Sequence, residues 1–213
     1  PYLYPLLDLC AVSIAADIVH VTGENRILAH YGLERLRTSQ CRTGFLSLLE
    51  AANKRPETLS FRDIGFSIGP RINAAGRMES GLRAVELLRS KNKEEQDKLA
   101  NAINDFNTDR QSTQADIFEE AKALLDSASF PNSTVLYAPH WHKGVVGIVA
   151  SKMVEHYYRP TIVLTKSGDV LAGSARSVLD FDVYNALEAC ESHLLQFGGH
   201  KYAAGMTLDE AQL

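Results

Sequence analysis

The stretch FGGHKYAAG near the C-terminus combines residue types that could hold an anion. Gly198 and Gly199 directly precede His200. Neighbouring glycines let the backbone approach a ligand closely or adopt a positive φ, and a histidine can donate to an anion or bind a metal. The alternative is a turn that carries two glycines and a surface histidine. Both interpretations fit this stretch taken alone.

Two further clusters precede it in the last third of the chain. GSARS contains Ser174 and Arg176, which suit a phosphate because a guanidinium gives charge-assisted hydrogen bonds; a polar strand end with a solvated arginine is the simpler alternative. APHWHKGVVG places Trp141 and His142 before a predicted helix, whose N-terminus attracts anions; a strand-to-helix turn with packing glycines is the alternative. Because each cluster lies at a predicted element end, together they fit an extended, phosphate-rich ligand.

The first half of the chain holds two weaker candidates. In GPRINAAGR, Arg71 and Arg77 flank Asn73, so the two guanidinium groups could face a phosphate, or a helix could begin there with its arginines paired to carboxylates. Within the apolar segment 6–20, the AAD stretch (15–17) ends an apolar run with Asp17, which at a strand end could ligate a hard divalent cation. A lone aspartate more often caps a helix or forms a turn, and one carboxylate cannot hold a catalytic metal. Asp8 is a weaker candidate of the same kind.

Apolar spacing predicts helices between residues 26 and 126 and an α/β arrangement after them. Gly69-Pro70 is expected to interrupt its segment, and residues 127–133 to form a boundary. Helices are expected over 26–37, 43–54 and 82–126, the last with a break near 90–93. Strands are then expected over 134–138, 160–165, 170–177 and 203–208, with helices over 143–157 and 182–194. Alternating strands and helices predict a partly parallel, mixed sheet.

Composition narrows the class of protein. The 213 residues are 45% hydrophobic and 23% charged, as in a globular domain, and no apolar run reaches the ~18 residues of a membrane helix. A formal net charge of −4 weighs mildly against a non-specific nucleic-acid binder, which is usually basic. The widely spaced Cys10, Cys41 and Cys190 argue against a disulfide framework and a CxxC zinc site. We therefore expect a reducing, cytoplasmic setting.

Seven stretches, in family order and across nearly the whole chain, give the sequence a specific resemblance to a known family. It resembles the RecJ family of DHH-superfamily phosphoesterases, which are single-strand-specific 5′→3′ DNA exonucleases. The matching stretches are DLCAVSIAADIV, GENRILAHYGLERLR, IGPRINAAGRM, NDFNTDRQ, WHKGVVGIVASKMVE, GSARS and FGGHKYAAGMTL.

The resemblance implies a division into three parts. Residues 1–80 would be the C-terminal part of a DHH catalytic domain, 81–128 a connecting helical region, and 129–213 a second α/β domain, the DHH-associated substrate-binding domain, which could be truncated. Family members use two Mn²⁺ or Mg²⁺ ions held by Asp and His residues, and Asp17 matches the last of those ligands. The family's earlier Asp-rich and Asp-His-His motifs are absent here. We therefore expect a fragment with an incomplete metal site and no nuclease activity of its own.

The resemblance also implies roles for the clusters. His200 would donate to a phosphate near the metals, as a catalytic and substrate-binding residue, and the glycines before it would let backbone amides approach. Trp141 would stack a base or belong to the core. The expected substrate-binding residues are Arg71, Asn73, Arg77, Trp141, His142, Ser174, Arg176, Gly198, Gly199 and His200.

The expected function is that of a strand-gripping fragment of an exonuclease in DNA repair and recombination, whose parent hydrolyses phosphodiesters by two-metal catalysis. Its partner would be single-stranded DNA, with a single-strand-binding protein or a helicase as further partners, and no membrane. Three alternatives remain: a DHH-type hydrolase of short oligonucleotides or cyclic dinucleotides, a non-catalytic nucleic-acid-binding scaffold, and a small-molecule α/β binding domain.

Overall fold

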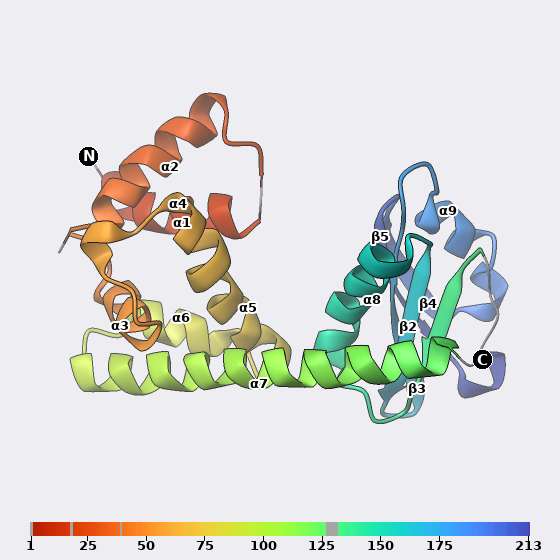
Figure 1. Cartoon of the computed structure of the whole chain (residues 1–213). Helices are drawn as coiled ribbons and strands as arrows, with labels where there is room; N and C mark the ends of the chain where they lie inside the picture. Colours follow the sequence, from red (N-terminus) through yellow and green to blue (C-terminus); the bar gives the residue numbers. More distant parts are fainter. Residues whose placement is uncertain (1, 18, 39, 127–131) are drawn as a thin grey trace. The chain divides into compact units, whose positions relative to one another are not determined.

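The computed structural model describes residues 2–17, 19–38, 40–126 and 132–213. The chain divides into two compact units, Pro1–Arg110 and Gln111–Leu213, and the division falls within the long helix α7 (Lys93–Asp126) (Figure 1). The break predicted near 90–93 is present between α6 and α7, whereas most of the predicted boundary at 127–133 lies outside the described residues. The three-part division at residues 80 and 128 stays a prediction.

The first unit is helical in its described residues. Short 3₁₀ turns at Tyr4–Leu6 and Pro56–Thr58 precede α1 and α4. The core is formed by apolar residues that include Phe45, Leu48 and Ile64. The helices are α1 (Leu7–Ala16), α2 (Gly23–Leu36), α3 (Thr43–Ala51), α4 (Phe61–Asp63), a π-helical segment (Ile64–Ile68), α5 (Gly69–Met78), α6 (Leu82–Arg89) and the first part of α7.

The apolar run before Asp17 is a helix, so the expectation of a strand end there is wrong. Asp17 is the C-cap of α1, and its N–H donates to the carbonyl oxygen of Ser13. An alanine-rich run suits a helix, and periodicity alone cannot separate a short buried helix from a buried strand. Asp8 is fully buried and forms an ion pair with Arg42, whose backbone N–H also donates to that carboxylate. Asp8 thus has a structural role, because it connects α1 to Arg42.

Gly69-Pro70 does not interrupt the helix, contrary to the sequence-based expectation. The chain is helical from Phe61 to Met78, and its start is a capping box in which Ser60 and Asp63 bond each other's backbone N–H. Pro70 lacks an N–H and lies two residues after the π-helical segment, near the N-terminus of α5. The altered hydrogen-bond spacing of a π-helical turn accommodates the proline without ending the helix.

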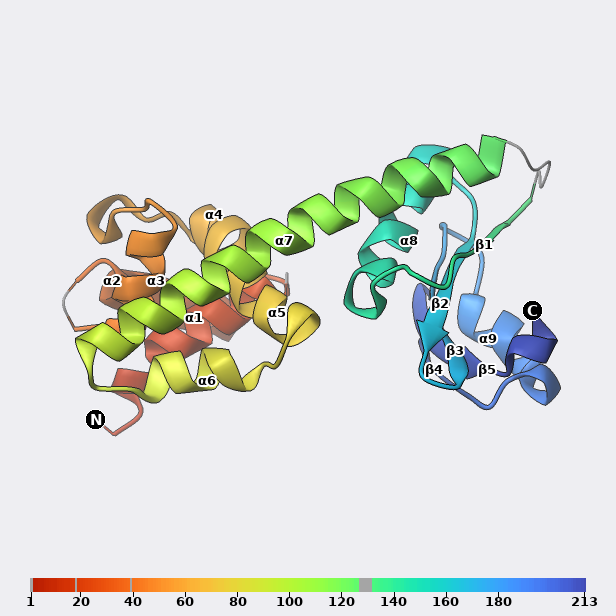
Figure 2. The ribbon, with the colours of Figure 1, turned by 90° about the horizontal axis from the view of Figure 1, so that it is seen from below.

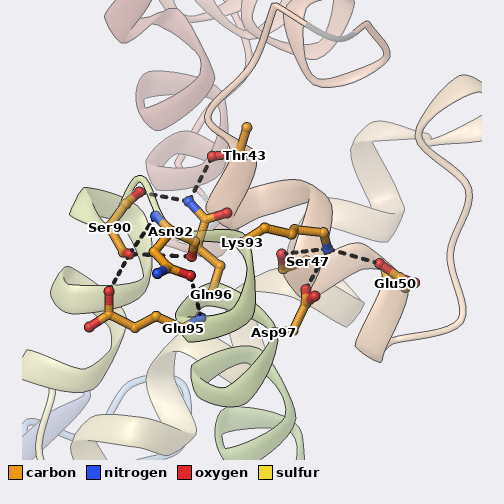
Figure 3. Close-up of polar contacts among 9 residues, drawn as sticks. All are labelled: Thr43, Ser47, Glu50, Ser90, Asn92, Lys93, Glu95, Gln96 and Asp97. Atoms are coloured by element: carbon orange, nitrogen blue, oxygen red, sulfur yellow. Dashed lines mark hydrogen bonds and ion pairs between the residues drawn. The ribbon is translucent and has the colours of Figure 1, made fainter.

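A polar network fixes the beginning of α7 against α3 (Figure 3). Gln96 is 1% exposed, and its amide Nε2 donates to Thr43 Oγ1 at 2.7 Å and to the Ser90 carbonyl oxygen at 2.6 Å. Lys93 lies on the exposed side of the same turn, where it bonds Ser47 Oγ and the carboxylates of Glu50 and Asp97. Both side chains thus connect α7 to α3, Gln96 through hydrogen bonds of a buried amide and Lys93 through exposed ion pairs.

The second unit is a five-stranded mixed sheet of order β1-β2-β3-β5-β4, with β1 and β2 parallel and the other pairs antiparallel. Helix α8 (Lys143–Tyr157) and helix α9 (Val183–Glu188) lie on opposite faces of this sheet (Figures 1 and 2). Short 3₁₀ turns occupy Glu191–His193 and Glu210–Gln212. The strands are β1 (Thr134–Tyr137), β2 (Thr161–Ser167), β3 (Val170–Arg176), β4 (Gln196–His200) and β5 (Ala203–Leu208).

The partly parallel sheet and α8 are as predicted, with two differences. The helix expected over 182–194 ends at Glu188. Strand β4 was not predicted, because its QFGGH sequence lacks the alternating apolar residues that indicate a strand. In the described residues, no helix has the length and hydrophobicity required to cross a bilayer.

Replacement of Gln96 should destabilise the chain more than replacement of Lys93. Gln96→Met removes the two hydrogen bonds made by a side chain that is 1% exposed, and at about 0.5–1.5 kcal/mol for each bond we expect a loss of about 1–3 kcal/mol in unfolding free energy. Lys93→Met removes exposed ion pairs and should cost less than about 1 kcal/mol. Urea unfolding followed by circular dichroism measures the unfolding free energy of both variants. Equal losses would contradict the inference that Gln96 contributes more than Lys93 to fixing α7 against α3.

Candidate nucleic-acid interface

The register of β3, β5 and β4 brings two of the predicted clusters into parallel rows. Ser174 pairs with Gly205, which pairs with Gly198. Two residues further along β3, Arg176 pairs with Ala203, which pairs with His200. Directly paired residues, and residues two apart on a strand, share a face of the sheet. Ser174, Arg176, Gly198 and His200 therefore all lie on one face.

That face is covered unevenly by the second unit. Over β3 it meets α8, where a Cβ built on Gly147 would lie 3.0 Å from Ser174 Oγ and 3.1 Å from Arg176 Nη2. Over β4 and β5 the residues Gly198, His200 and Gly205 are exposed. The opposite face holds the core that α9 covers, with Ala175, Ala204 and Met206. The exposed part over β4 and β5 is called the glycine strip below.

Arg176 is oriented by hydrogen bonds to two elements. Its Nε donates to Ser151 Oγ of α8 at 3.1 Å, and its Nη1 donates to Ser174 Oγ at 2.8 Å and to the Ala175 carbonyl oxygen at 2.7 Å. Ser151 Oγ in turn donates to the Gly147 carbonyl oxygen. The guanidinium is half-buried, so it is fixed in direction before any ligand arrives.

The glycines of this site have different structural roles. A Cβ on Gly198 would have no neighbour within 4 Å, and one on Gly205 would meet only the Gly173 carbonyl oxygen, at 3.8 Å. Gly199 has φ of 151°, and a Cβ there would lie 2.3 Å from the Ala203 carbonyl oxygen. Gly199 is therefore required by the β4–β5 hairpin itself, whereas Gly198 and Gly205 leave open space above the sheet.

His200 can act as a hydrogen-bond donor at the edge of the glycine strip. Its ring is exposed, and Nδ1 accepts from the backbone N–H of Tyr202 at 3.3 Å. With Nδ1 as acceptor, a neutral ring carries its proton on Nε2. The Nε2–H is then the group that can donate to an anion.

Trp141 and His142 are engaged in local structure. Trp141 is 3% exposed, and its Nε1 donates to Glu120 Oε2 at 2.9 Å. This bond, followed by one from His140, lowers the pKa of Glu120 below its ordinary value. His142 is the N-cap of α8 and accepts from the Gly144 N–H at 3.1 Å. The Trp141 ring is not exposed for stacking on a base, so the structure favours the core role that the sequence left open.

In the first unit, Arg71 and Arg77 of GPRINAAGR both lie within α5. The sequence leaves two arrangements open, with both side chains facing a phosphate or both paired to carboxylates, and the two arginines differ in their surroundings. Arg71 donates to Asn104 Oδ1 at 3.0 Å and to the backbone and hydroxyl of Ser67, and burial lowers its pKa. Arg77 is exposed. Burial of Arg110 is the larger cause of its lowered pKa, and the nearby charge of Arg77 is the second cause. Arg110 was missed by the residue-level reasoning, although it lies in the NDFNTDRQ stretch.

Asp17 and Asn73 line one pocket of about 440 Å³ in the first unit. Its other lining residues are mostly apolar and include Val12, Phe45 and Ile72. Among the residues that the structure describes, no group of three or more His, Cys, Asp or Glu side chains could hold a metal ion. The donor set here therefore does not fit a complete two-ion centre.

Comparison with known proteins identifies relatives along the whole chain. A model of the DHHA1 domain matches residues 132–213. The chain is 39% identical to the single-stranded-DNA-specific exonuclease RecJ of Salmonella typhimurium over 220 residues, covering 99% of the chain and 38% of that protein. RecJ of Bacillus subtilis is also 39% identical, over 206 residues, which cover 95% of the chain and 26% of the relative.

Solved structures agree with these relatives. The crystal structure of Thermus thermophilus RecJ in complex with Mg²⁺ matches 99% of the chain and 33% of that protein, with a TM-score of 0.87 and 33% identity. The chain thus spans 38% of the length of the Salmonella typhimurium protein and 33% of the Thermus thermophilus chain. With the DHHA1 match, this similarity along almost all of its residues shows that the chain is a RecJ-family segment that carries a DHHA1 domain.

Proposed function

We propose that this chain is the strand-gripping part of an exonuclease that removes nucleotides from the 5′ end of single-stranded DNA. The observation that carries the proposal is the arrangement of a fixed arginine and an exposed histidine in one row, beside a row that ends in two exposed glycines. The relatives are named single-stranded-DNA-specific exonucleases, which favours a DNA strand as the ligand.

Each residue of the site would do one task. Arg176 would hold a terminal or neighbouring phosphate by charge-assisted hydrogen bonds, with Ser174 setting its direction. His200 would donate from Nε2 to a phosphate oxygen, and Gly198 and Gly205 would let the strand lie close to the sheet. Because Arg176 is already oriented, little side-chain ordering would be needed on binding. His142 would contribute through the N-terminus of α8, which it caps.

The first unit would supply a second set of cations. Burial and then the charge of Arg77 lower the pKa of Arg110, so the two guanidinium groups lie close enough to interact, and an anion near both would be attracted by their combined charge. With Arg71 and Asn73, they would contact phosphates of the strand on the side of the catalytic domain. The resemblance to the RecJ family implies the same substrate-binding role for the GPRINAAGR stretch. These contacts would position the strand without reading its sequence.

The metal chemistry would belong to the longer parent protein. Solved RecJ structures of Thermus thermophilus contain Mg²⁺ or Mn²⁺, and such ions supply a hydroxide nucleophile and stabilise charge on a phosphate. Here Asp17 would be one ligand, but the described residues do not complete the set. No hydrolytic step is therefore assigned to side chains of this chain, and its own task would be to bind and orient the strand.

Arg176→Ala should weaken binding to a 5′-phosphorylated single strand. Loss of hydrogen bonds from a charged group costs about 1.5–3 kcal/mol, or at least about tenfold in affinity, and the salt slope should fall by about 0.7 per lost phosphate contact. Fluorescence anisotropy across a salt series, with and without the 5′-phosphate, measures both effects. Unchanged binding would remove Arg176 from the phosphate site.

Lys166→Ala is the matched control for this substitution. Lys166 is exposed and paired with Glu210, and it pairs across the sheet with Leu171, on the face opposite to Arg176. Its replacement removes one positive charge from the same unit but should leave affinity and salt slope unchanged. Equal effects of the two variants would indicate a non-specific charge effect.

A phosphorylated dinucleotide that competes as well as a 12-nucleotide strand would favour the short-substrate alternative.

Alanine at the two adjacent glycines should separate binding from folding. A Cβ on Gly198 meets nothing, so Gly198→Ala should keep the thermal unfolding midpoint but weaken strand binding by filling the glycine strip. Gly199→Ala should lower the midpoint, because its Cβ collides with β5 and its φ is strained for alanine. Scanning calorimetry and anisotropy measure the two effects. Normal DNA binding by Gly198→Ala would argue against close approach of the strand there.

A further inference from the structure

Three exposed large apolar side chains follow directly after the strand ends that carry Arg176 and His200. The loop over residues 177–182 leaves β3 directly after Arg176, and residues 201–202 form the turn of the β4–β5 hairpin directly after His200. Leu179 is 65% exposed, Phe181 40% and Tyr202 46%. Large apolar side chains at this exposure are costly to leave in water and often mark a contact surface when they are grouped.

Hydrogen bonds hold the loop and the turn together at both ends. The Ser177 N–H donates to the Tyr202 carbonyl oxygen at 3.0 Å, and the Val183 N–H donates to the Lys201 carbonyl oxygen at 3.0 Å. Within the loop, Ser177 Oγ donates to the Phe181 carbonyl oxygen at 2.8 Å. The loop that carries Phe181 is therefore tied through its backbone to the turn that carries Tyr202.

The two exposed charges on this surface, Lys201 and Asp180, are opposite in sign, so together they do not attract a phosphate as Arg176 does. Lys201 Nζ lies 5.4 Å from the centre of the Tyr202 ring, an arrangement that also favours the π-face of a base. Asp180, exposed at the loop tip with φ of 69°, would repel a phosphate placed there. Asp182 is occupied as the cap of α9, where it accepts from the Asn185 N–H. The anionic part of a nucleotide would thus lie toward Arg176 and His200, and its neutral part toward the aromatic rings.

We propose that Phe181 and Tyr202 form a stacking platform for the 5′-terminal bases of the strand. The proposal rests on the function proposed above, because it needs the terminal phosphate at Arg176 and His200. It supplies the base contact that the buried Trp141 cannot make. Base–aromatic stacking contributes strongly to single-strand binding and tolerates any base, since every base has a π-face.

The test compares a 5′-phosphorylated oligonucleotide with the same strand made abasic at its first two positions. Tyr202→Leu and Phe181→Leu remove a ring but keep an apolar side chain; Tyr202→Phe keeps the ring and is the matched control. We expect each leucine variant to lose about tenfold in affinity for the normal strand and nothing for the abasic one. Tyr202→Phe should bind both strands as the unchanged chain does.

A second readout follows the base directly. 2-Aminopurine at the first position should lose fluorescence on binding the unchanged chain, because stacking quenches it, and should keep it with Tyr202→Leu. Thermal unfolding of each variant checks that the hairpin is intact. If Phe181→Leu unfolds early, Tyr202 alone carries the test.

The outcomes separate the two proposals. Equal affinity for normal and abasic strands, with the 5′-phosphate still required, would overturn the stacking platform and leave the strand-gripping function in place. Equal losses of Tyr202→Leu on both strands would show a backbone contact and would also overturn it. Binding that ignores the 5′-phosphate, or no binding at low salt, would overturn the function on which the platform depends.

Discussion

The antiparallel pairing of β5 with both β3 and β4 is the constraint on which the site depends. It sets Ser174, Gly205 and Gly198 in one row and Arg176, Ala203 and His200 in the next. A slip of one residue would move every side chain of a strand to the opposite face, where α9 and the core lie. The register is fixed by the apolar residues of that opposite face, such as Ala204 and Met206, so core packing on one side determines which groups the other side presents.

The second constraint is the close approach of α8 to β3. Gly147 leaves room for Ser174 and Arg176 beneath the helix, and Ser151 on the same helix bonds the arginine. A guanidinium shared by a strand and a helix is oriented by the fold itself. This also explains how a chain with a formal net charge of −4 could hold a polyanion: what matters is the local direction of a few cations, in each unit separately.

Much of the second unit could be predicted from sequence, because its strands are apolar runs and α8 has clear limits. Prediction from sequence fails for strand β4, which was not expected, and for the helix before Asp17, which was expected to be a strand. A glycine-rich strand has few side chains to alternate, and its identity comes from pairing with β5. Ten largely apolar residues fit a buried helix or a buried strand equally well. Pro70 continues the helix because a π-helical segment precedes it, and such a segment has no simple sequence signal.

The sequence identifies the candidate residues by type, whereas the structure shows which of them are exposed. Nothing in the type of Trp141 indicates that Glu120, on α7, holds its indole N–H. Gly198 and Gly199 are the same residue in sequence, yet only the second is required by the hairpin. Arg110 became visible only when its helix lay beside α5. Such contacts between residues far apart in the chain are what a single sequence does not contain.

The glycine strip has an entropic consequence. A surface built from lysines would have to order a long, flexible side chain for each contact, at a cost of about 0.5–1.5 kcal/mol apiece. Gly198 and Gly205 have no rotamers to lose, and Ala203 beside them has none either. A ligand lying there would meet a surface that is already in its final state, so the free energy of its few contacts would not be spent on ordering the protein.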